Sequence, residues 1–203
     1  MIRSFALVTA LMLAACTPAQ DQQAAPLSDG IWKLASDQST IAFVSVKAGD
    51  VGEAHRFETV EGSVADDGAV TLTIDLASVQ TDIDIRNERM RDMLFEVASF
   101  PDATLTAKID PALIKNLKPG EAAALNVPVE LNLHGARQSI DAKLSVTRIA
   151  PDAVQVQTVA PLIVDAAAFG MEGGIEKLRA VANLPAISTA VPVTASLVFR
   201  PQS

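Results

Sequence analysis

The chain contains no tyrosine, one tryptophan and one cysteine, and aromatic side chains make up only 4% of its 203 residues. Aromatic stacking platforms for bases and aromatic cages for quaternary amines are therefore hard to build from it. Positive charge is also scarce, because 16 Lys and Arg stand against 24 Asp and Glu, for a net charge of -8. The basic residues are scattered, so no footprint for a phosphate backbone is present. We expect no nucleic acid partner.

The sequence offers few groups for catalysis. Its only histidines are His55 and His134, and neither accompanies a G-x-S-x-G nucleophile motif or the H-x-x-x-H and H-E-x-x-H spacings of metal sites. Gly170, Gly173 and Gly174 lack the strand-loop-helix setting and the lysine-serine ending of a phosphate loop. We therefore expect no enzyme and no metal site, with a hydrolase or metal-binding protein as one alternative.

The first twenty residues are arranged like an export signal. Arg3 is followed by an apolar run over residues 5–13 and then by small residues before Cys16. The run is far shorter than the ~20 residues that a transmembrane helix needs. The stretch Leu13-Ala14-Ala15-Cys16 resembles the bacterial lipobox, in which the cysteine receives a diacylglycerol and becomes the mature N-terminus. We expect residues 1–15 to be a lipoprotein signal peptide and Cys16 the lipidation site; an ordinary signal peptide is the alternative.

Residues 16–29 are polar and proline-marked and show no apolar periodicity. Such a composition is typical of a flexible tether, so the folded domain is expected over residues 30–203. Thr17, rather than Asp, follows the cysteine, which resembles the outer-membrane address of enteric lipoproteins. We expect a protein that is lipid-anchored at the periplasmic face of a bacterial cell envelope, at the outer membrane, with the inner membrane as the alternative.

The dominant pattern after the tether is alternation of apolar and polar residues. Leu125, Val127, Val129, Leu131 and Leu133 alternate with polar residues or proline, which predicts a strand with one apolar face. Similar runs occupy residues 40–46, 69–76, 103–109, 140–147, 154–160, 161–164 and 191–199, with turn signals between them. About eight strands at hairpin spacing predict an all-β fold, an antiparallel barrel or sandwich.

Two segments of the mature chain have helical periodicity. The first places Met90, Met93, Leu94 and Val97 on one face and charged residues on the others. The second runs over residues 175–182 and stops before a proline. We expect two short helices that cap the ends of a barrel. Whether the methionines line a ligand cavity or only fill the core stays open, because methionine suits both roles.

Several motifs in one order resemble a known family. They are "SVQT" (78–81), "RNERMRD" (86–92), "FPDAT" (100–104), "LHG" (133–135) and "DAAAFG" (165–170), and they resemble the YceI-like polyisoprenoid-binding family from about Trp32 to Phe199. With its lipobox, the chain resembles a lipoprotein subgroup of that family. The resemblance implies a lipocalin-like, eight-stranded antiparallel β-barrel whose interior binds a long isoprenoid or another amphiphilic chain.

The lining of such a site follows from the chemistry of its ligand. A polyprenyl or fatty chain presents only CH2 and CH3 groups, so it needs a continuous apolar tunnel, in which each buried CH2 contributes ~0.8 kcal/mol. The candidate ligand-binding residues are Phe43, Leu72, Ile74, Leu105, Val129, Leu131, Val164 and Phe199, with Met90, Met93 and Leu94 at a mouth. Alternation groups residues by face but does not say which face points inward.

We therefore expect a membrane-anchored periplasmic lipoprotein that binds or carries an isoprenoid or fatty-acid-like lipid and has no other cofactor. A non-catalytic envelope module with a filled barrel is the alternative, and the volume of any internal cavity distinguishes the two. The sequence leaves a homodimer open.

Overall fold

The computed structural model describes residues 25–202, so the signal peptide, Cys16 and the first part of the tether lie outside the described residues. One antiparallel sheet of twelve strand segments forms the body of the molecule. The strands are β1 (Trp32–Leu34), β2 (Thr40–Lys47), β3 (Val51–Phe57), β4 (Val60–Val64), β5 (Ala69–Asp75), β6 (Val79–Gln80), β7 (Asp102–Lys108), β8 (Ala122–Leu133), β9 (Ala136–Ala150), β10 (Ala153–Thr158), β11 (Leu162–Asp165) and β12 (Ala190–Pro201).

The sheet closes on itself. Beside the order β1-β4-β5-β7-β8-β9-β10-β12-β2-β3-β6, the short strand β1 pairs with both β4 and β12. Only residues 58–59 separate β3 from β4, and only residues 159–161 separate β10 from β11. When each of these pairs is counted as one interrupted strand, the barrel wall has eight strands: β2, β3–β4, β5, β7, β8, β9, β10–β11 and β12. The predicted eight-stranded antiparallel barrel is confirmed.

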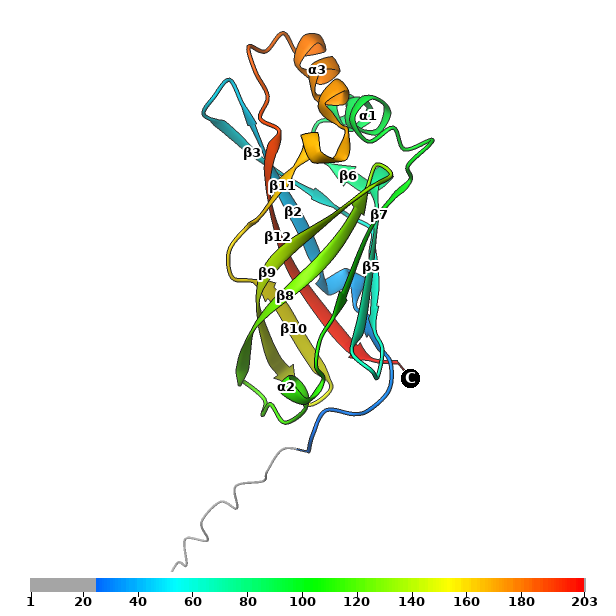
Figure 1. Ribbon diagram of the computed structural model, residues 1–203, viewed down its shortest axis with the longest axis vertical. Coiled ribbons are helices and arrows are strands. Elements are labelled where there is room, and N and C mark those ends of the chain that lie inside the picture. The colour runs from blue at the N-terminus through cyan, green and yellow to red at the C-terminus, as the bar shows by residue number, and fades with distance from the viewer. Residues whose placement is uncertain (1–24, 203) are drawn as a thin grey trace, which may run out of the picture.

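The alternating pattern decides which face of each strand turns inward. Along β8, Leu125, Val127, Val129 and Leu131 are buried, whereas Asn126, Pro128 and Glu130 are exposed. Burial of the apolar face drives this arrangement, since an antiparallel sheet can keep its other face in water. The barrel is elongated, and its long axis is vertical in Figure 1. The apolar faces predicted from the sequence therefore line the interior.

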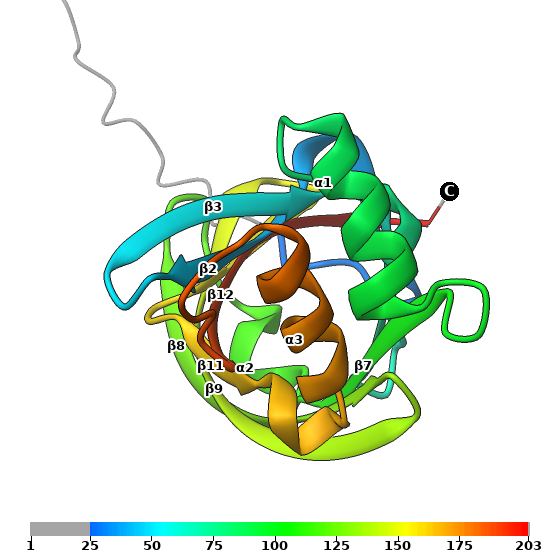
Figure 2. The same ribbon diagram turned by 90° about the horizontal axis from the view of Figure 1, so that it is seen from above.

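Short helical segments connect the strands, and some of them close the two ends of the barrel. They are η1 (Ser36–Gln38), η2 (Leu76–Ser78), α1 (Asp84–Arg89), η3 (Met90–Phe95), α2 (Ala112–Lys115), η4 (Ala166–Phe169) and α3 (Glu172–Val181). The two predicted helices, α1 with η3 and α3, are present, and both lie over the same end (Figures 1 and 2). A Cβ at Gly174 of α3 would lie 2.6 Å from the carbonyl oxygen of Met93, so glycine permits this close helix packing.

The opposite end is closed by α2 and by the N-terminal segment over residues 25–29. Leu27 is buried, and its backbone N–H donates to the Lys115 carbonyl at 2.9 Å. The buried guanidinium of Arg148 donates to the carbonyl oxygens of Ala25 at 2.7 Å and Pro151 at 2.7 Å. The folded unit thus includes residues 25–29, which the sequence assigned to the tether. Their packing depends on one leucine and on backbone carbonyl groups. Neither produces a periodic pattern in the sequence, so this packing could not be predicted from it.

Within residues 25–202, no helix has both the length and the apolar character required to cross a bilayer.

Candidate functional site

A cavity of about 420 Å³ occupies the half of the barrel beneath α1, η3 and α3, within the range of ~300–1,000 Å³ that is typical of ligand pockets. Inward side chains of the strands form its walls, and residues of the three helical segments cover it. A second cavity of about 180 Å³ lies toward the α2 end. Leu72, Leu105 and Val129 line both cavities. The two spaces therefore adjoin along the barrel axis, which suits an elongated ligand.

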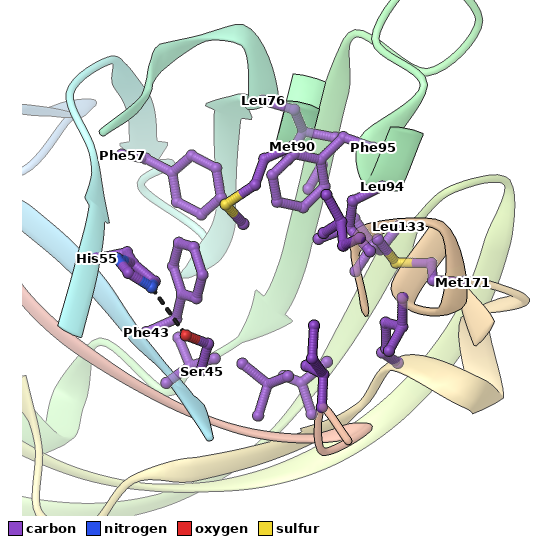
Figure 3. A pocket seen from close by; sticks show the side chains of 18 of the residues that line it. Phe43, Ser45, His55, Phe57, Leu76, Met90, Leu94, Phe95, Leu133 and Met171 are labelled. Atoms are coloured by element: carbon purple, nitrogen blue, oxygen red, sulfur yellow. Dashed lines mark hydrogen bonds between the residues drawn. The ribbon is translucent and has the colours of Figure 1, made fainter. Parts of the chain in front are cut away.

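Aromatic side chains form one wall of the larger cavity. The rings of Phe43 and Phe57 lie 5.3 Å apart, and those of Phe57 and Phe95 lie 5.7 Å apart. Figure 3 shows these rings beside the thioether of Met90. The wall brings β2, β3 and η3 together, so the helical cap is part of the cavity itself.

The mouth of the cavity is apolar and lies beside the helices. Ile85 at the start of α1 and Val181 at the end of α3 line the cavity, yet they are 52% and 45% exposed. Ile83 lines it as well and is 48% exposed. Side chains that reach both the cavity and solvent mark an entrance between these two helices.

Most of the residues that the sequence proposed as ligand-binding face these cavities. The larger cavity is lined by Phe43, Leu72, Ile74, Met90, Leu94, Leu105, Val129, Leu131 and Val164. Phe199 lines the second cavity, because it lies on the part of β12 that pairs with β1 and β10. Met93 lines neither cavity. For the residues other than Met93, the structure shows a position in the wall of a cavity.

Met93 is displaced because the helix changes its winding. After α1 the chain continues as the π-helical segment η3, which ends at Glu96 in the left-handed conformation. Hydrogen bonds from i to i+5 put more residues into each turn than an α-helix has. Met90, Leu94 and Phe95, at i, i+4 and i+5, therefore face the cavity together. Met93, at i+3, is rotated away from it.

Several residues that line the larger cavity were not predicted from the sequence. Phe57 and His55 lie on the inward face of β3, and Met171 and Ile175 enter from the start of α3. The i, i+2 spacing of His55 and Phe57 was a usable signal, since it puts both on one strand face. Ile175 belonged to the apolar stripe of the predicted second helix, but nothing in the sequence placed that helix over the same opening as the first.

The larger cavity has one polar corner, built by the paired strands β2 and β3. Alternation puts Phe43, Ser45 and Lys47 on the inward side of β2, and the register pairs Phe43 with His55 and Ser45 with Glu53. Ser45 Oγ lies 2.9 Å from His55 Nε2, the contact drawn as a dashed line in Figure 3. The polar side chains of the corner thus lie next to the aromatic wall on the same two strands.

An ion-pair network holds α1 against this corner. Lys47 Nζ lies 2.6 Å from Glu53 Oε2, and Arg86 Nη1 donates to the same oxygen. Arg86 Nη2 also donates to the Thr81 carbonyl at 2.6 Å. The hydrogen bond from Lys47 lowers the pKa of Glu53, and the charge of Arg86 acts in the same direction. Glu53 is consequently ionised and joins the two cations.

His55 is buried, at 4% exposed. Burial is the main cause that lowers its pKa, and the positive charge of Arg86 lowers it further, so the imidazole is neutral at neutral pH. Two buried nitrogens of the corner, His55 Nδ1 and Arg86 Nε, have no hydrogen-bond partner among the described residues. Such groups are costly to bury alone. The corner therefore has unused hydrogen-bonding capacity beside an apolar chamber.

The second histidine lies elsewhere. His134 occupies the turn between β8 and β9, its ring centroid 4.2 Å from that of Phe100, and it lines neither cavity. In the part of the chain that the structure describes, no three His, Cys, Asp or Glu side chains gather in a metal-binding arrangement.

Comparison with known proteins places this geometry in a family. The sequence matches the YceI-like domain over residues 32–199. A solved polyisoprenoid-binding domain from Saccharophagus degradans, implicated in plant cell wall breakdown, is 42% identical, with a TM-score of 0.82 and coverage of 84% of this chain and 98% of that chain. Comparison with curated proteins finds no significant match.

Two more distant structures share the fold alone. BcnA from Burkholderia cenocepacia is 19% identical, with a TM-score of 0.64, and the match covers 81% of this chain and 98% of that one. A mutant YceI protein from Campylobacter jejuni is 14% identical, with a TM-score of 0.54 and coverage of 73% and 85%. The match over residues 32–199 takes in nearly all of the barrel wall, the helical cap and most of the lining of both cavities, and the chain belongs to the YceI-like domain family.

Proposed function

We propose that this protein binds the hydrocarbon chain of one amphiphilic lipid inside its barrel and carries that lipid in the periplasm, held to a membrane by a lipid on Cys16. The main support for this proposal is the apolar cavity of about 420 Å³, which a second cavity adjoins. Each CH2 group transferred from water into such a space contributes ~0.8 kcal/mol. The polyisoprenoid-binding description of the 42% identical domain also supports the proposal.

A non-catalytic module with a filled barrel is the competing function. It requires side chains to occupy the interior, and two adjoining cavities count against it. The decisive experiment is organic extraction of protein purified from its native host, followed by mass spectrometry. Recovery of a stoichiometric amphiphile supports carriage, whereas an empty interior in host-purified protein contradicts it.

A cavity-filling variant tests the same proposal in vitro. Val129 points into the junction of the two cavities, and its neighbour Glu130 points outward on the same strand. Val129→Trp should reduce binding of a fluorescent fatty-acid probe more than tenfold, at an overpacking cost of about 1–3 kcal/mol. Glu130→Trp is the matched control and should bind normally. Equal affinity in both variants would show that the probe binds outside the barrel.

The anchor is supported by the motif Leu13-Ala14-Ala15-Cys16. Cys16→Ala should abolish labelling by an alkyne fatty acid and move the protein out of the membrane fraction, while Thr17→Ala should leave both unchanged. Undiminished labelling of the Cys16→Ala variant would refute the proposed anchor but would not affect the proposal of lipid binding.

A further inference from the structure

The charge at the mouth of the larger cavity is opposite in sign to that of the whole protein. Among residues 25–202, the charged side chains that line this cavity are Lys47, Glu53, Arg86 and Arg89, three cations and one anion. The chain as a whole carries a net charge of -8. All four residues belong to β2, β3 and α1 at the capped end. Positive charge is thus concentrated where the apolar lining ends.

Glu53 compensates only part of this charge. Its Oε2 atom accepts from both Lys47 and Arg86, and no carboxylate of the described residues lies within ion-pair distance of Arg89. The Arg86 Nε–H is buried without an acceptor. Burying such a donor without a partner is costly, and an acceptor oxygen on a ligand would satisfy it with a charge-assisted hydrogen bond. The corner is therefore short of acceptors.

His55 does not add to the positive charge. It is neutral because burial and Arg86 lower its pKa, against the opposing effect of Glu53 and Asp82; Lys47 acts in the same direction as Arg86. His55 is bonded to the Ser45 hydroxyl, which lines the cavity. The excess charge therefore comes from Lys47, Arg86 and Arg89.

We propose that Ser45, Lys47, Arg86 and Arg89 form a headgroup subsite for a carboxylate or a phosphate, so that the carried lipid is an anionic amphiphile rather than the corresponding alcohol. The inference rests on the proposed lipid-binding function. The anion accepts charge-assisted hydrogen bonds from the cations while its chain enters the apolar chamber. A neutral headgroup leaves the excess positive charge without a counter-ion in a partly desolvated mouth.

Matched ligand pairs test the headgroup directly. Purified, delipidated protein is titrated by calorimetry with dodecanoate against dodecanol, and with farnesyl phosphate against farnesol. In each pair the anion should bind at least about tenfold more tightly than its alcohol, the effect of one hydrogen bond to a charged group. Added salt should narrow this difference, since the mouth is open to solvent. Comparison of dodecanoate with farnesyl phosphate then distinguishes a carboxylate source from a phosphate source.

Two arginines of one helical stretch provide the matched variants. Arg89 lines the cavity, whereas the Arg91 guanidinium donates to the Ala77 carbonyl at 3.3 Å and lines neither cavity. Arg89→Gln should weaken dodecanoate binding by about five- to tenfold and leave dodecanol binding unchanged. Arg91→Gln removes the same charge and should leave both affinities unchanged. Circular dichroism confirms that each variant is folded.

Each outcome has a distinct meaning. Equal affinity of the wild-type protein for dodecanoate and dodecanol overturns the headgroup subsite but leaves lipid binding intact. A loss in Arg89→Gln that is equal for the acid and the alcohol also overturns it, because packing of the helix would then be the cause. Failure of all four ligands to bind the wild-type protein refutes the proposed lipid-binding function itself.

Discussion

His55 makes the stability of the folded chain depend on pH. Its pKa is lowered in the folded state, chiefly by burial, from an ordinary value of 6.5. The unfolded chain therefore binds a proton at higher pH than the folded chain does, and the free energy of unfolding falls as the pH drops through about 6.5. The loss ends below the folded-state pKa. Glu53, whose pKa is also lowered, acts in the same direction but only below its ordinary value of 4.5.

Urea denaturation of the wild-type protein and of His55→Gln at about pH 7.5 and about pH 5 measures this effect. Glutamine can keep a hydrogen bond to Ser45 but does not titrate. We expect the wild-type protein to lose more unfolding free energy between the two pH values than the variant does. An identical loss in both proteins would assign the pH dependence to other groups.

At the scale of the element, the winding of η3 makes a prediction about two neighbouring residues. Met93 and Leu94 are both half-buried, yet only Leu94 lines the cavity. Leu94→Glu puts a charge against the hydrocarbon chain, where burial without a partner is costly, so probe affinity should fall more than tenfold. Met93→Glu should bind like the wild-type protein. A fluorescent alcohol probe is the suitable readout, because repulsion of an anionic headgroup then plays no part.

The result also decides between two descriptions of the helix. Regular α-helical winding puts Met93 and Leu94 on the same stripe and predicts equal losses. If both glutamate variants bind normally, η3 is not part of the site. If both unfold, the two side chains belong to the structural core, and circular dichroism would reveal this before any binding is measured.

The N-terminal segment should contribute to stability as a packed element. Leu27 is 7% exposed against the barrel, while Leu113 of the adjacent α2 is 56% exposed. Leu27→Ala should lower the free energy of unfolding by about 2 kcal/mol, at the lower end of the range for buried leucines. Leu113→Ala should change it by less than about 0.5 kcal/mol. Chemical denaturation measures both, and equal small effects would indicate that residues 25–29 do not stay packed in solution.

Most of the fold could be predicted from the alternation of apolar and polar residues along the strands. The alternation in β8 and β9 fixes which side chains share a face, and the scarcity of long helical patterns left only a few short caps to place. The family resemblance supplied the closed barrel that alternation alone could not separate from a sandwich. The site was harder to predict from sequence, because Lys47, Glu53 and His55 lie on two separate strands and form no recognisable motif. Only the pairing register of β2 and β3 brings them to the mouth beside Arg86.

The two ends of the barrel are built differently. The entrance lies between α1 and α3, and the N-terminal segment is packed at the α2 end (Figure 1). If Cys16 is coupled to a vesicle lipid, an inserted flexible segment of about 20 residues in the tether should speed uptake of a lipid probe from that same vesicle. Uptake from separate vesicles should not change. If the rate of uptake from the anchoring vesicle does not change with tether length, loading at the α2 end is favoured.

If Cys16 is the lipid anchor, the packed position of Ala25 gives the anchored molecule a preferred orientation. Nine residues lead from Cys16 to Ala25, and an extended chain of that length spans at most about 30 Å. With Cys16 in a leaflet, the α2 end therefore faces the bilayer and the entrance opens toward the aqueous compartment. In that orientation, cargo would arrive from the far side of that compartment or from a second carrier, and the proposed anchored protein would receive it on the side away from its own membrane.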